Sequence, residues 1–217
     1  MIYDGSVRGT PKNVSAFHIM DDGSLLLVFS ANQKMTIEGN SKATATPYDV
    51  VKFIPNDPNT FPLGAGTYEW FFQGKQNGLS VGAEKIDSLD YVGNRLLLST
   101  TGTANVTLPN GTAFKPTKED VFVFNKTTDQ WESTLVIDGS MIPELKGKNI
   151  SSVWDDPNSN DYYVTITGAF KIGGVKGNAQ SIVKLTPNGS SFTPSFVDWL
   201  APGQKFPSNL DGLDIAP

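Results

Sequence analysis

The chain has 217 residues, a net charge of −5 and a charged fraction of 18%, and it contains no cysteine. The negative charge disfavours nucleic acid and anionic membrane surfaces, which are bound through Lys and Arg. The lack of cysteine excludes disulfide scaffolds, zinc–thiolate sites and thiol nucleophiles, and no apolar run reaches the roughly 18 residues that a membrane span needs.

Gly, Asn, Ser and Thr are frequent between short apolar runs, which is typical of strands joined by polar turns rather than of long helices. The first predicted strands are Val14–Ile19, Leu25–Phe29, Asp49–Phe53 and Tyr68–Phe72. Asp22-Gly23 separates the first two and is a strong signal for a hairpin turn. The preceding segment Ile2-Tyr3-Asp4-Gly5 has the pattern of a last strand and lacks the features of a signal peptide.

The second group of strands shows the pattern most clearly. Ile86–Val92 alternates apolar and polar side chains, as in a strand with one buried face. Gly93-Asn94 then forms a turn into an apolar strand that Gly102 ends. The predicted strands of this group are Ile86–Val92, Arg95–Thr101, Asp120–Phe124 and Trp131–Ile137.

The third group follows the same order and is followed by one more strand-like segment, Leu210–Ile215, which has the pattern of a first strand. Its predicted strands are Ile150–Trp154, Tyr162–Ile166, Ser181–Leu185 and Phe192–Leu200. Each group has a polar segment between its second and third strands, which predicts long loops suited to contact a partner. These segments are Ala31–Pro47, Thr103–Lys118 and Ala169–Ala179.

The first strands of the groups align with one another at spacings of 72, 64 and 60 residues. The aligned segments are Val14–His18, Ile86–Asp90, Ile150–Trp154 and Leu210–Asp214. Tandem four-stranded units predict an all-β, propeller-like arrangement of repeats of about 60–70 residues. A sandwich of linked hairpins is the competing fold, but it has no reason to repeat in phase. The prediction is a single domain, 1–217, with repeats at approximately 1–72, 73–137 and 138–200 and a partial unit at 201–217.

Three full units thus lie between two single strands, Ile2–Gly5 and Leu210–Ile215, which would form half of a fourth unit. An unpaired strand edge invites association with another chain. Three arrangements follow. The chain is a piece of a longer array, or the units close as a small ring, or the terminal strands pair between chains.

Motifs of this chain resemble those of an uncharacterised group of secreted bacterial repeat proteins that reads YFDGS…GL…EDIDALD…LYLSTTG…EDVFVF. The similar stretches are Phe72-Gln73-Gly74…Gly78-Leu79, Ile86–Asp90, Leu96–Gly102, Glu119–Phe124 and Asn209–Ile215. The third unit departs from the pattern, with Ser151, Trp154 and Gln180-Ser181 in place of acids, and the first unit keeps only Asp49. The resemblance implies an extracellular or cell-surface location and brings no catalytic residues.

Six acids at repeated positions are candidate calcium ligands, because carboxylates two or three residues apart at strand ends supply the oxygen atoms that calcium requires. They are Asp87, Asp90, Glu119, Asp120, Asp211 and Asp214. No Asp-x-Asp-x-Asp-Gly loop accompanies them. The alternative interpretation is structural, with these acids bonding backbone amides at the corners of the units.

No catalytic signature accompanies the single histidine, His18, which takes the position that Asp90 has in the next unit. Asp155-Asp156 could be a glycosidase acid/base pair, but the following Pro157–Asp161 is typical of a turn with Asx capping. The sequence therefore predicts a protein that is not an enzyme. A cavity with two facing carboxylates, or with a carboxylate beside His18, would favour a hydrolase instead.

Aromatic side chains recur at strand positions and predict either packing between units or a platform for sugar rings. They are Trp70, Phe71, Phe72, Trp131, Trp154 and Trp199. Six Asn-x-Ser/Thr sequons are consistent with glycosylation or with turn chemistry. They begin at Asn13, Asn105, Asn110, Asn125, Asn149 and Asn188.

Together these patterns predict an extracellular or cell-surface binding or structural module, met as a mature or excised chain without a signal peptide. Its predicted partners are a protein or glycan surface, or a second copy paired through Ile2–Gly5 and Leu210–Ile215. The alternatives are a glycan-directed hydrolase, a lectin-like carbohydrate-binding propeller and a virion surface component. No cofactor other than calcium is suggested.

Overall fold

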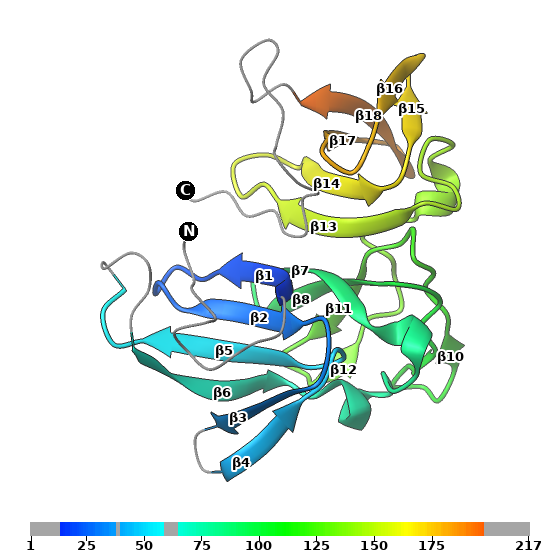
Figure 1. Cartoon of the computed structure of the whole chain (residues 1–217). Helices are drawn as coiled ribbons and strands as arrows, with labels where there is room; N and C mark the ends of the chain where they lie inside the picture. The colour runs from blue at the N-terminus through cyan, green and yellow to red at the C-terminus, as the bar shows by residue number, and fades with distance from the viewer. Residues whose placement is uncertain (1–13, 38–39, 59–64, 198–217) are drawn as a thin grey trace.

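The computed structural model describes residues 14–37, 40–58 and 65–197, which form three four-stranded antiparallel sheets (Figure 1). Sheet 1 contains β1 (Val14–Ile19), β2 (Leu25–Phe29), β5 (Val50–Pro55) and β6 (Gly66–Phe72). Sheet 2 contains β7 (Ile86–Val92), β8 (Arg95–Thr100), β11 (Phe122–Asn125) and β12 (Gln130–Trp131). Sheet 3 contains β13 (Asn149–Asp155), β14 (Tyr162–Thr167), β17 (Ile182–Asn188) and β18 (Ser191–Val197). The predicted all-β fold class is confirmed.

The strands of each sheet lie side by side in chain order, and the predicted strands differ from the observed ones mainly in the outer strand β12. The predicted end of β18, residues 198–200, lies outside the described residues. The backbone after Trp131 leaves the ladder and returns only at an isolated bridge between Val121 and Ile137, so β12 is shorter than predicted. Ser133 and Thr134, which are exposed, lie between these points. Strand β18 contains Pro194, which is tolerated because β18 is the outer strand of its sheet.

The segments predicted as long loops contain two-stranded hairpins, so the loop prediction is wrong in this respect. The hairpins are β3 (Gln33–Ile37) with β4 (Asn40–Ala45), β9 (Val106–Thr107) with β10 (Ala113–Phe114), and β15 (Phe170–Ile172) with β16 (Val175–Gly177). Gly173 and Gly174 join the last pair with φ angles of 55° and 84°. Positive φ at both central residues is what a type I′ hairpin turn needs, and glycine adopts it without steric cost.

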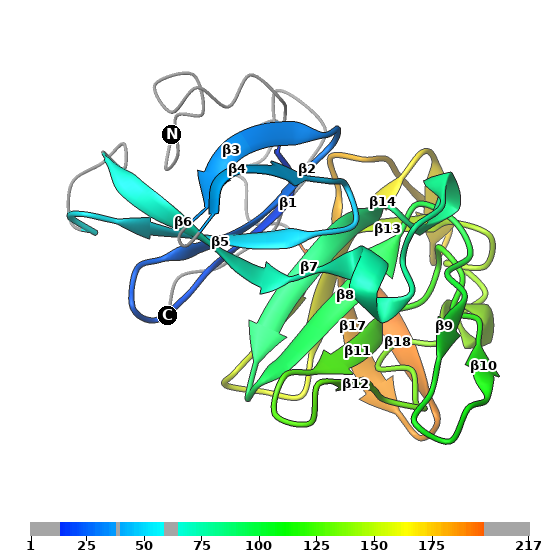
Figure 2. The same cartoon turned by 90° about the horizontal axis from the view of Figure 1, so that it is seen from below.

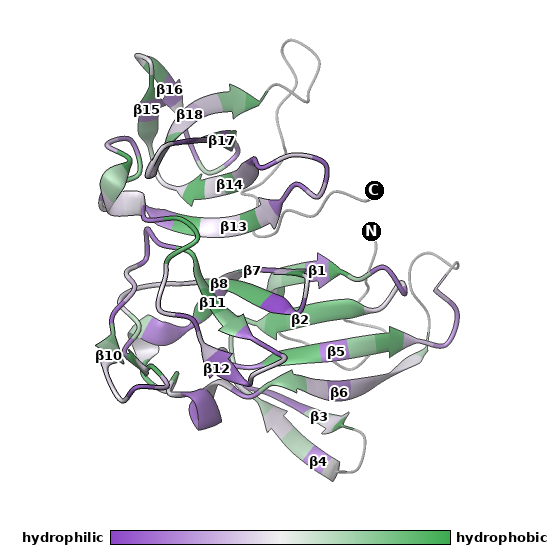
Figure 3. Cartoon of the chain, turned by 180° about the vertical axis from the view of Figure 1, so that it is seen from behind, coloured by the Kyte–Doolittle hydropathy of each residue, from purple (hydrophilic) through white to green (hydrophobic). Residues whose placement is uncertain are grey.

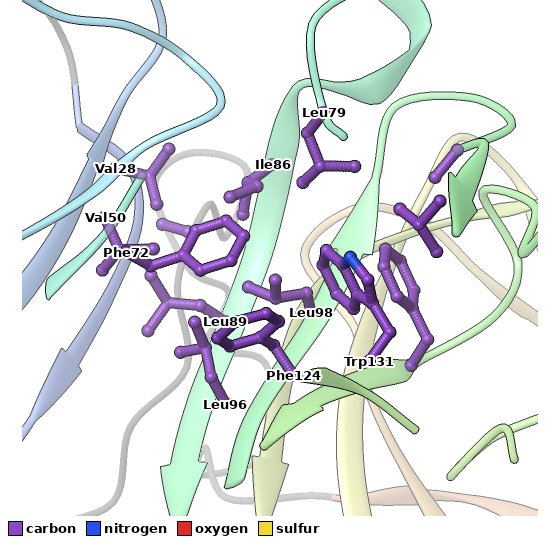
Figure 4. Close-up of a cluster of buried hydrophobic side chains, with 14 of the residues drawn as sticks. Val28, Val50, Phe72, Leu79, Ile86, Leu89, Leu96, Leu98, Phe124 and Trp131 are labelled. Carbon is purple, nitrogen blue, oxygen red and sulfur yellow. The ribbon is translucent and has the colours of Figure 1, made fainter. Parts of the chain in front are cut away.

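Strand β2 is apolar and buried along its whole length, and the other middle strands contain apolar runs, because both faces of the sheets are covered there (Figure 3). In β8, Leu96 and Leu98 enter the cluster between sheets 1 and 2, whereas Leu97 enters the cluster with sheet 3. Each fully buried leucine contributes about 1.5–3 kcal/mol. Figure 4 shows the first cluster, in which Phe72 meets Trp131 edge to face with 5.7 Å between ring centroids.

The first strands β1, β7 and β13 pack together, with β7 contacting both of the others (Figures 1 and 2). Each has a β-bulge at the same repeat position, and the bulged residues are Ser15, Asp87 and Ser151. A bulge changes the direction in which the side chain of the extra residue points. Here Ser15 Oγ donates to the carbonyl of Ile86 on β7, and Asp87 accepts a hydrogen bond from Asn149 on β13.

In sheets 1 and 2, a buried aspartate precedes the third strand. Its hydrogen bonds join the turn before this strand to the segment that follows the fourth strand. Asp120 accepts hydrogen bonds from the amide of Thr117 at 2.7 Å, from its hydroxyl at 2.9 Å, and from the amide of Gly139 at 3.0 Å. The same bonds in sheet 1 join Asp49 to Thr46 and Gly74. Two backbone amides from distant segments are thus held by one carboxylate, and we call this arrangement the corner clamp.

The corner clamp is weaker in sheet 3, where Ser181 takes the place of the aspartate. Its hydroxyl accepts from the amide of Asn178 at 3.2 Å. The turn itself is kept, since Ser181 N donates to the carbonyl of Asn178 at 2.9 Å. The substitution noticed in the sequence, Gln180-Ser181 for two acids, therefore exchanges a charged acceptor for a neutral one at the same corner.

The terminal strands Ile2–Gly5 and Leu210–Ile215, and with them the predicted half unit, lie outside the described residues. Within the described ranges the sheets form neither a closed barrel nor a propeller ring. The helices of this part, η1 (Gly74–Asn77), η2 (Gly82–Glu84) and η3 (Gly139–Met141), are single turns, and none has the length or apolar character to cross a membrane.

Candidate functional site

A cavity of about 590 Å³ lies where the hairpins that join the first two strands of each sheet come together. Each sheet contributes to its wall from the end of its first strand and the following turn. The residues of sheet 1 are His18–Gly23, those of sheet 2 are Asp90–Asn94, and those of sheet 3 are Trp154, Asp155 and Pro157. His18, Asp90 and Trp154 are equivalent positions of the three aligned repeats, so the repeat itself places them around one cavity.

Asp90 joins all three sheets at the wall of this cavity. Its Oδ1 lies 2.8 Å from His18 Nδ1 of sheet 1 and accepts from the amide of Tyr91 at 2.8 Å. Its Oδ2 accepts from the amide of Asp155 in sheet 3 at 2.6 Å. The side chain is 3% exposed. A buried carboxylate is stable only when its oxygens are paired in this way, so Asp90 acts as the hub of the junction.

Asp155 lies at the same junction, but its carboxyl group has no hydrogen-bond donor among the described residues. The side chain is half-buried. Burial, together with the negative charge of Asp90, raises the pKa of Asp155 to about 6, while Arg95 acts in the opposite direction. Arg95 itself forms an ion pair with Glu132 at 2.9 Å.

The other acids of the wall are differently placed. Asp22 pairs with Lys52 Nζ at 2.9 Å and accepts from the amide of Ser24 at 2.9 Å. Burial raises the pKa of Asp22, but the hydrogen bonds from Ser24 and Lys52 outweigh it and bring the pKa to about 2. Asp21 faces solvent. None of the described residues that line the cavity is Lys or Arg.

Two aromatic side chains give the cavity flat apolar walls. Trp154 is half-buried and leans on Tyr163 with 5.2 Å between ring centroids. Tyr91 packs edge to face on Phe71 at 5.0 Å, and its hydroxyl donates to Asn94 Oδ1 at 3.0 Å. Both rings are therefore held by neighbours and present a fixed surface to the cavity.

The bulged Asp87 forms a second polar junction, deeper between sheets 2 and 3. Asn149 Nδ2 donates to Asp87 Oδ2 at 2.7 Å. The remaining oxygens, Asp87 Oδ1 and Asn149 Oδ1, are buried without a hydrogen-bond partner among the described residues. Burial raises the pKa of Asp87 to about 7, and the bond from Asn149 offsets only part of this rise. With its amide engaged, Asn149 is a poor glycosylation acceptor in the folded chain.

The four calcium candidates that the structure describes do not gather into one site. Asp87 and Asp90 lie on β7 with the partners given above, and Asp120 belongs to a corner clamp. Glu119 accepts from the amide of Gly147, and Asp211 and Asp214 lie outside the described residues. In the described chain, no group of three or more His, Asp or Glu side chains is placed to hold a metal ion. Calcium binding stays a prediction.

The predicted aromatic set divides between core and cavity. Phe72 and Trp131 belong to the core between sheets 1 and 2, and the indole N–H of Trp131 donates to the carbonyl of Asn77 at 2.8 Å. Trp70 packs against the core of sheet 1. Trp154 lines the cavity, and Trp199 lies outside the described residues. For most of this set the packing interpretation holds, and one member supplies a binding surface.

The two residues of the Asp155-Asp156 pair have different roles in the structure. Asp156 accepts from the amide of Asn158 at 2.9 Å and from the hydroxyl of Ser159, which is the predicted Asx-capped turn. Asp155 instead lines the cavity. Reading the pair as one turn therefore missed the role of its first member. The available signal was its position, one residue after the aligned column of His18 and Asp90.

No family model matches the chain, and no curated protein matches it. Among solved structures, the extracellular domain of the B. thetaiotaomicron protein BT4673 is similar, with a TM-score of 0.27 and 12% sequence identity. The similarity covers 89% of this chain and 36% of that one, so this chain spans about a third of its length. At this TM-score the similarity supports no conclusion about function.

Replacing Asp90 by Asn is expected to lower the free energy of unfolding by about 2–3 kcal/mol, because hydrogen bonds to a charged group contribute about 1.5–3 kcal/mol and an amide cannot accept at both ends. Urea unfolding followed by tryptophan fluorescence measures the change. Asp129→Asn, at an exposed turn, is the control and should change stability by less than about 0.5 kcal/mol. Equal stability of the two variants would show that Asp90 is not a hub.

Proposed function

We propose that the chain is a non-catalytic extracellular binding module of propeller-like architecture, whose cavity takes a small polar organic ligand. The cavity carries this proposal, because three repeats contribute equivalent residues to it. A concave site with aromatic walls and a few fixed polar groups is the usual form of a small-molecule site. The extracellular location rests on the sequence resemblance to secreted repeat proteins. Association through the terminal strands remains compatible with it.

The chemistry of the wall favours a ligand with a ring and several polar groups, such as a saccharide. Trp154 and Tyr91 offer faces on which a ring can lie. Asp155 has free acceptor oxygens for hydroxyl or amino groups, since carboxylates accept but do not donate. This is the lectin-like form of the predicted binding module.

Binding is tested with the purified chain and a panel of soluble monosaccharides, disaccharides and small amines, by saturation-transfer NMR and tryptophan fluorescence. We expect at least one panel member to bind, and Trp154→Leu to weaken its affinity by about tenfold or more, the scale of about 1.4 kcal/mol. Trp70→Leu is the control, since Trp70 is also half-buried but does not line this cavity. No binding by any member, or equal binding by both variants, contradicts the proposal.

A hydrolase is the second candidate, because the cavity does place a carboxylate, Asp90, beside His18. A carboxylate beside the single histidine is an arrangement that favours a hydrolase. The binding proposal is preferred because Asp90 is committed to three partners and because none of the described lining residues is Ser, Thr or Cys. Turnover of a bound saccharide, abolished by His18→Gln, would reverse this preference.

A further inference from the structure

We propose that the ligand of the cavity carries a positively charged nitrogen group, an ammonium or guanidinium, which pairs with Asp155 beside Trp154. This inference rests on the proposed function, because it names the chemical class of the ligand that the same cavity takes. The lining contains four carboxylates, from Asp21, Asp22, Asp90 and Asp155. Asp155 differs from the other three in the surroundings of its negative charge, because each of the others has a partner or is exposed to water.

Lys52 balances the negative charge of Asp22, and two backbone amides donate hydrogen bonds to Asp90, whose Oδ1 also lies 2.8 Å from His18 Nδ1. Asp21 is exposed to water. Asp155 is half-buried, receives no hydrogen bond from the described residues and lies near the negative charge of Asp90. Removing a charge from water without a partner is costly. A cation in the cavity would supply the missing partner.

The nearest cationic side chain does not fill this role. Arg95 acts on Asp155 only through its charge, and its guanidinium makes two hydrogen bonds to Glu132, at 3.1 and 2.9 Å. Glu132 is further fixed by Asn125 Nδ2 at 3.2 Å. The bidentate pair engages Arg95 Nε and Nη2 with Glu132, and no hydrogen bond joins Arg95 to Asp155 among the described residues.

The aromatic walls favour the same class of ligand. A cation over the face of Trp or Tyr is attracted by the ring quadrupole, most strongly by Trp. Trp154 precedes Asp155 in β13, and Tyr91 lies across the cavity on sheet 2. Because the lining described here holds no Lys or Arg, its field attracts a cationic ligand and repels an anionic one.

The test compares cations with neutral counterparts of the same shape, namely glucosamine with glucose, choline with 3,3-dimethylbutanol, and tyramine with 4-propylphenol. Dissociation constants are measured by calorimetry near pH 7.5 and low salt. We expect at least one cation to bind about tenfold or more tightly than its neutral counterpart. Asp155→Asn should remove this preference, because it lowers the affinity for the cation by more than the affinity for its neutral counterpart.

The matched control is Asp129→Asn, which removes the same unit of charge at an exposed turn outside the cavity. Asp129 has a φ of 56°, and Asn tolerates this left-handed conformation. The control should keep the preference for the cation. Should the neutral compounds bind as tightly as the cations, or the preference survive in Asp155→Asn, the charge inference is wrong while the proposed binding function stands. Binding by no compound overturns both.

Discussion

Replacing Gly139 by Ala is expected to lower the free energy of unfolding by about 2–4 kcal/mol. A Cβ atom at this position would lie 2.1 Å from the backbone oxygen of Glu119, so the backbone must move. The movement would separate Gly139 N from Asp120 Oδ1, which it now meets at 3.0 Å. The variant therefore loses the corner clamp as well as the close approach that the clamp secures. No side chain other than hydrogen fits at Gly139.

Urea unfolding of the full chain, followed by tryptophan fluorescence, measures this effect. The control is Gly82→Ala, because a Cβ at Gly82 would meet no atom within 4 Å. Gly82→Ala should change stability by less than about 1 kcal/mol. A second variant, Gly74→Ala, tests the repeat, since its Cβ would lie 2.1 Å from the backbone oxygen of Tyr48 and should cost a similar amount. If Gly139→Ala and Gly82→Ala unfold at the same urea concentration, the close approach at the corner is not what holds the units together.

The repeat made much of the fold predictable, because aligned segments must adopt the same local structure. Alternation in Ile86–Val92 identified β7, and the apolar run in Leu25–Phe29 identified a strand that is buried on both faces. The Gly173-Gly174 turn could also have revealed β15 and β16, but the polar composition of Ala169–Ala179 concealed three-residue strands. Such short strands give too few alternations to be distinguished from loops.

The cavity was only partly predictable. The alignment placed His18, Asp90 and Trp154 in one column, and equivalent positions on packed first strands necessarily converge. The sequence contained no sign that the Asp90 carboxyl group would lie beside His18. The position of Asp155 in the cavity wall was not predicted, because an Asp-Asp-Pro sequence is typical of a turn. Its second acid does form that turn, while the first belongs to the end of β13.

The junction of Asp87 and Asn149 could not be predicted, because the two residues are 62 positions apart and meet only through the packing of β7 on β13. The bulge that re-aims Asp87 is a feature of the sheet register, which single-chain alternation does not specify. The sequence suggested a calcium ligand at this position. The structure places the carboxyl group beside the amide of Asn149 in a buried place, and this burial has a measurable consequence.

Wild-type stability is expected to fall as the pH rises towards 7, through the titration of Asp87. Its pKa is about 7 in the folded chain and about 3.9 when unfolded. The folded state therefore holds the extra proton between these values, so the contribution is fully present below about pH 4 and is lost as pH rises through about 7. Three pKa units correspond to roughly 4 kcal/mol.

Asp87→Asn should remove this pH dependence of stability, because the asparagine side chain is neutral at every pH. Its amide can also pair with Asn149 through both its N–H group and its carbonyl oxygen. It supplies an N–H for Asn149 Oδ1 and an oxygen for Asn149 Nδ2, the atom that now donates to Asp87. We expect the variant to be more stable than the wild type by about 2 kcal/mol or more at pH 8 and to lie within about 1 kcal/mol of it at pH 4.5. Urea unfolding at a series of pH values measures the difference.

The difference between the two proteins isolates Asp87, since Asp155, whose pKa is also raised by burial, titrates in both. Asp129→Asn, which changes an exposed acid, should instead follow the wild type at every pH. A carbon-detected NMR titration of the Asp87 carboxyl group gives a direct check that does not depend on unfolding. If its midpoint lies near pH 4 and the two stability curves run parallel, Asp87 is ionised in the folded chain, and a group absent from the described contacts must then compensate its charge.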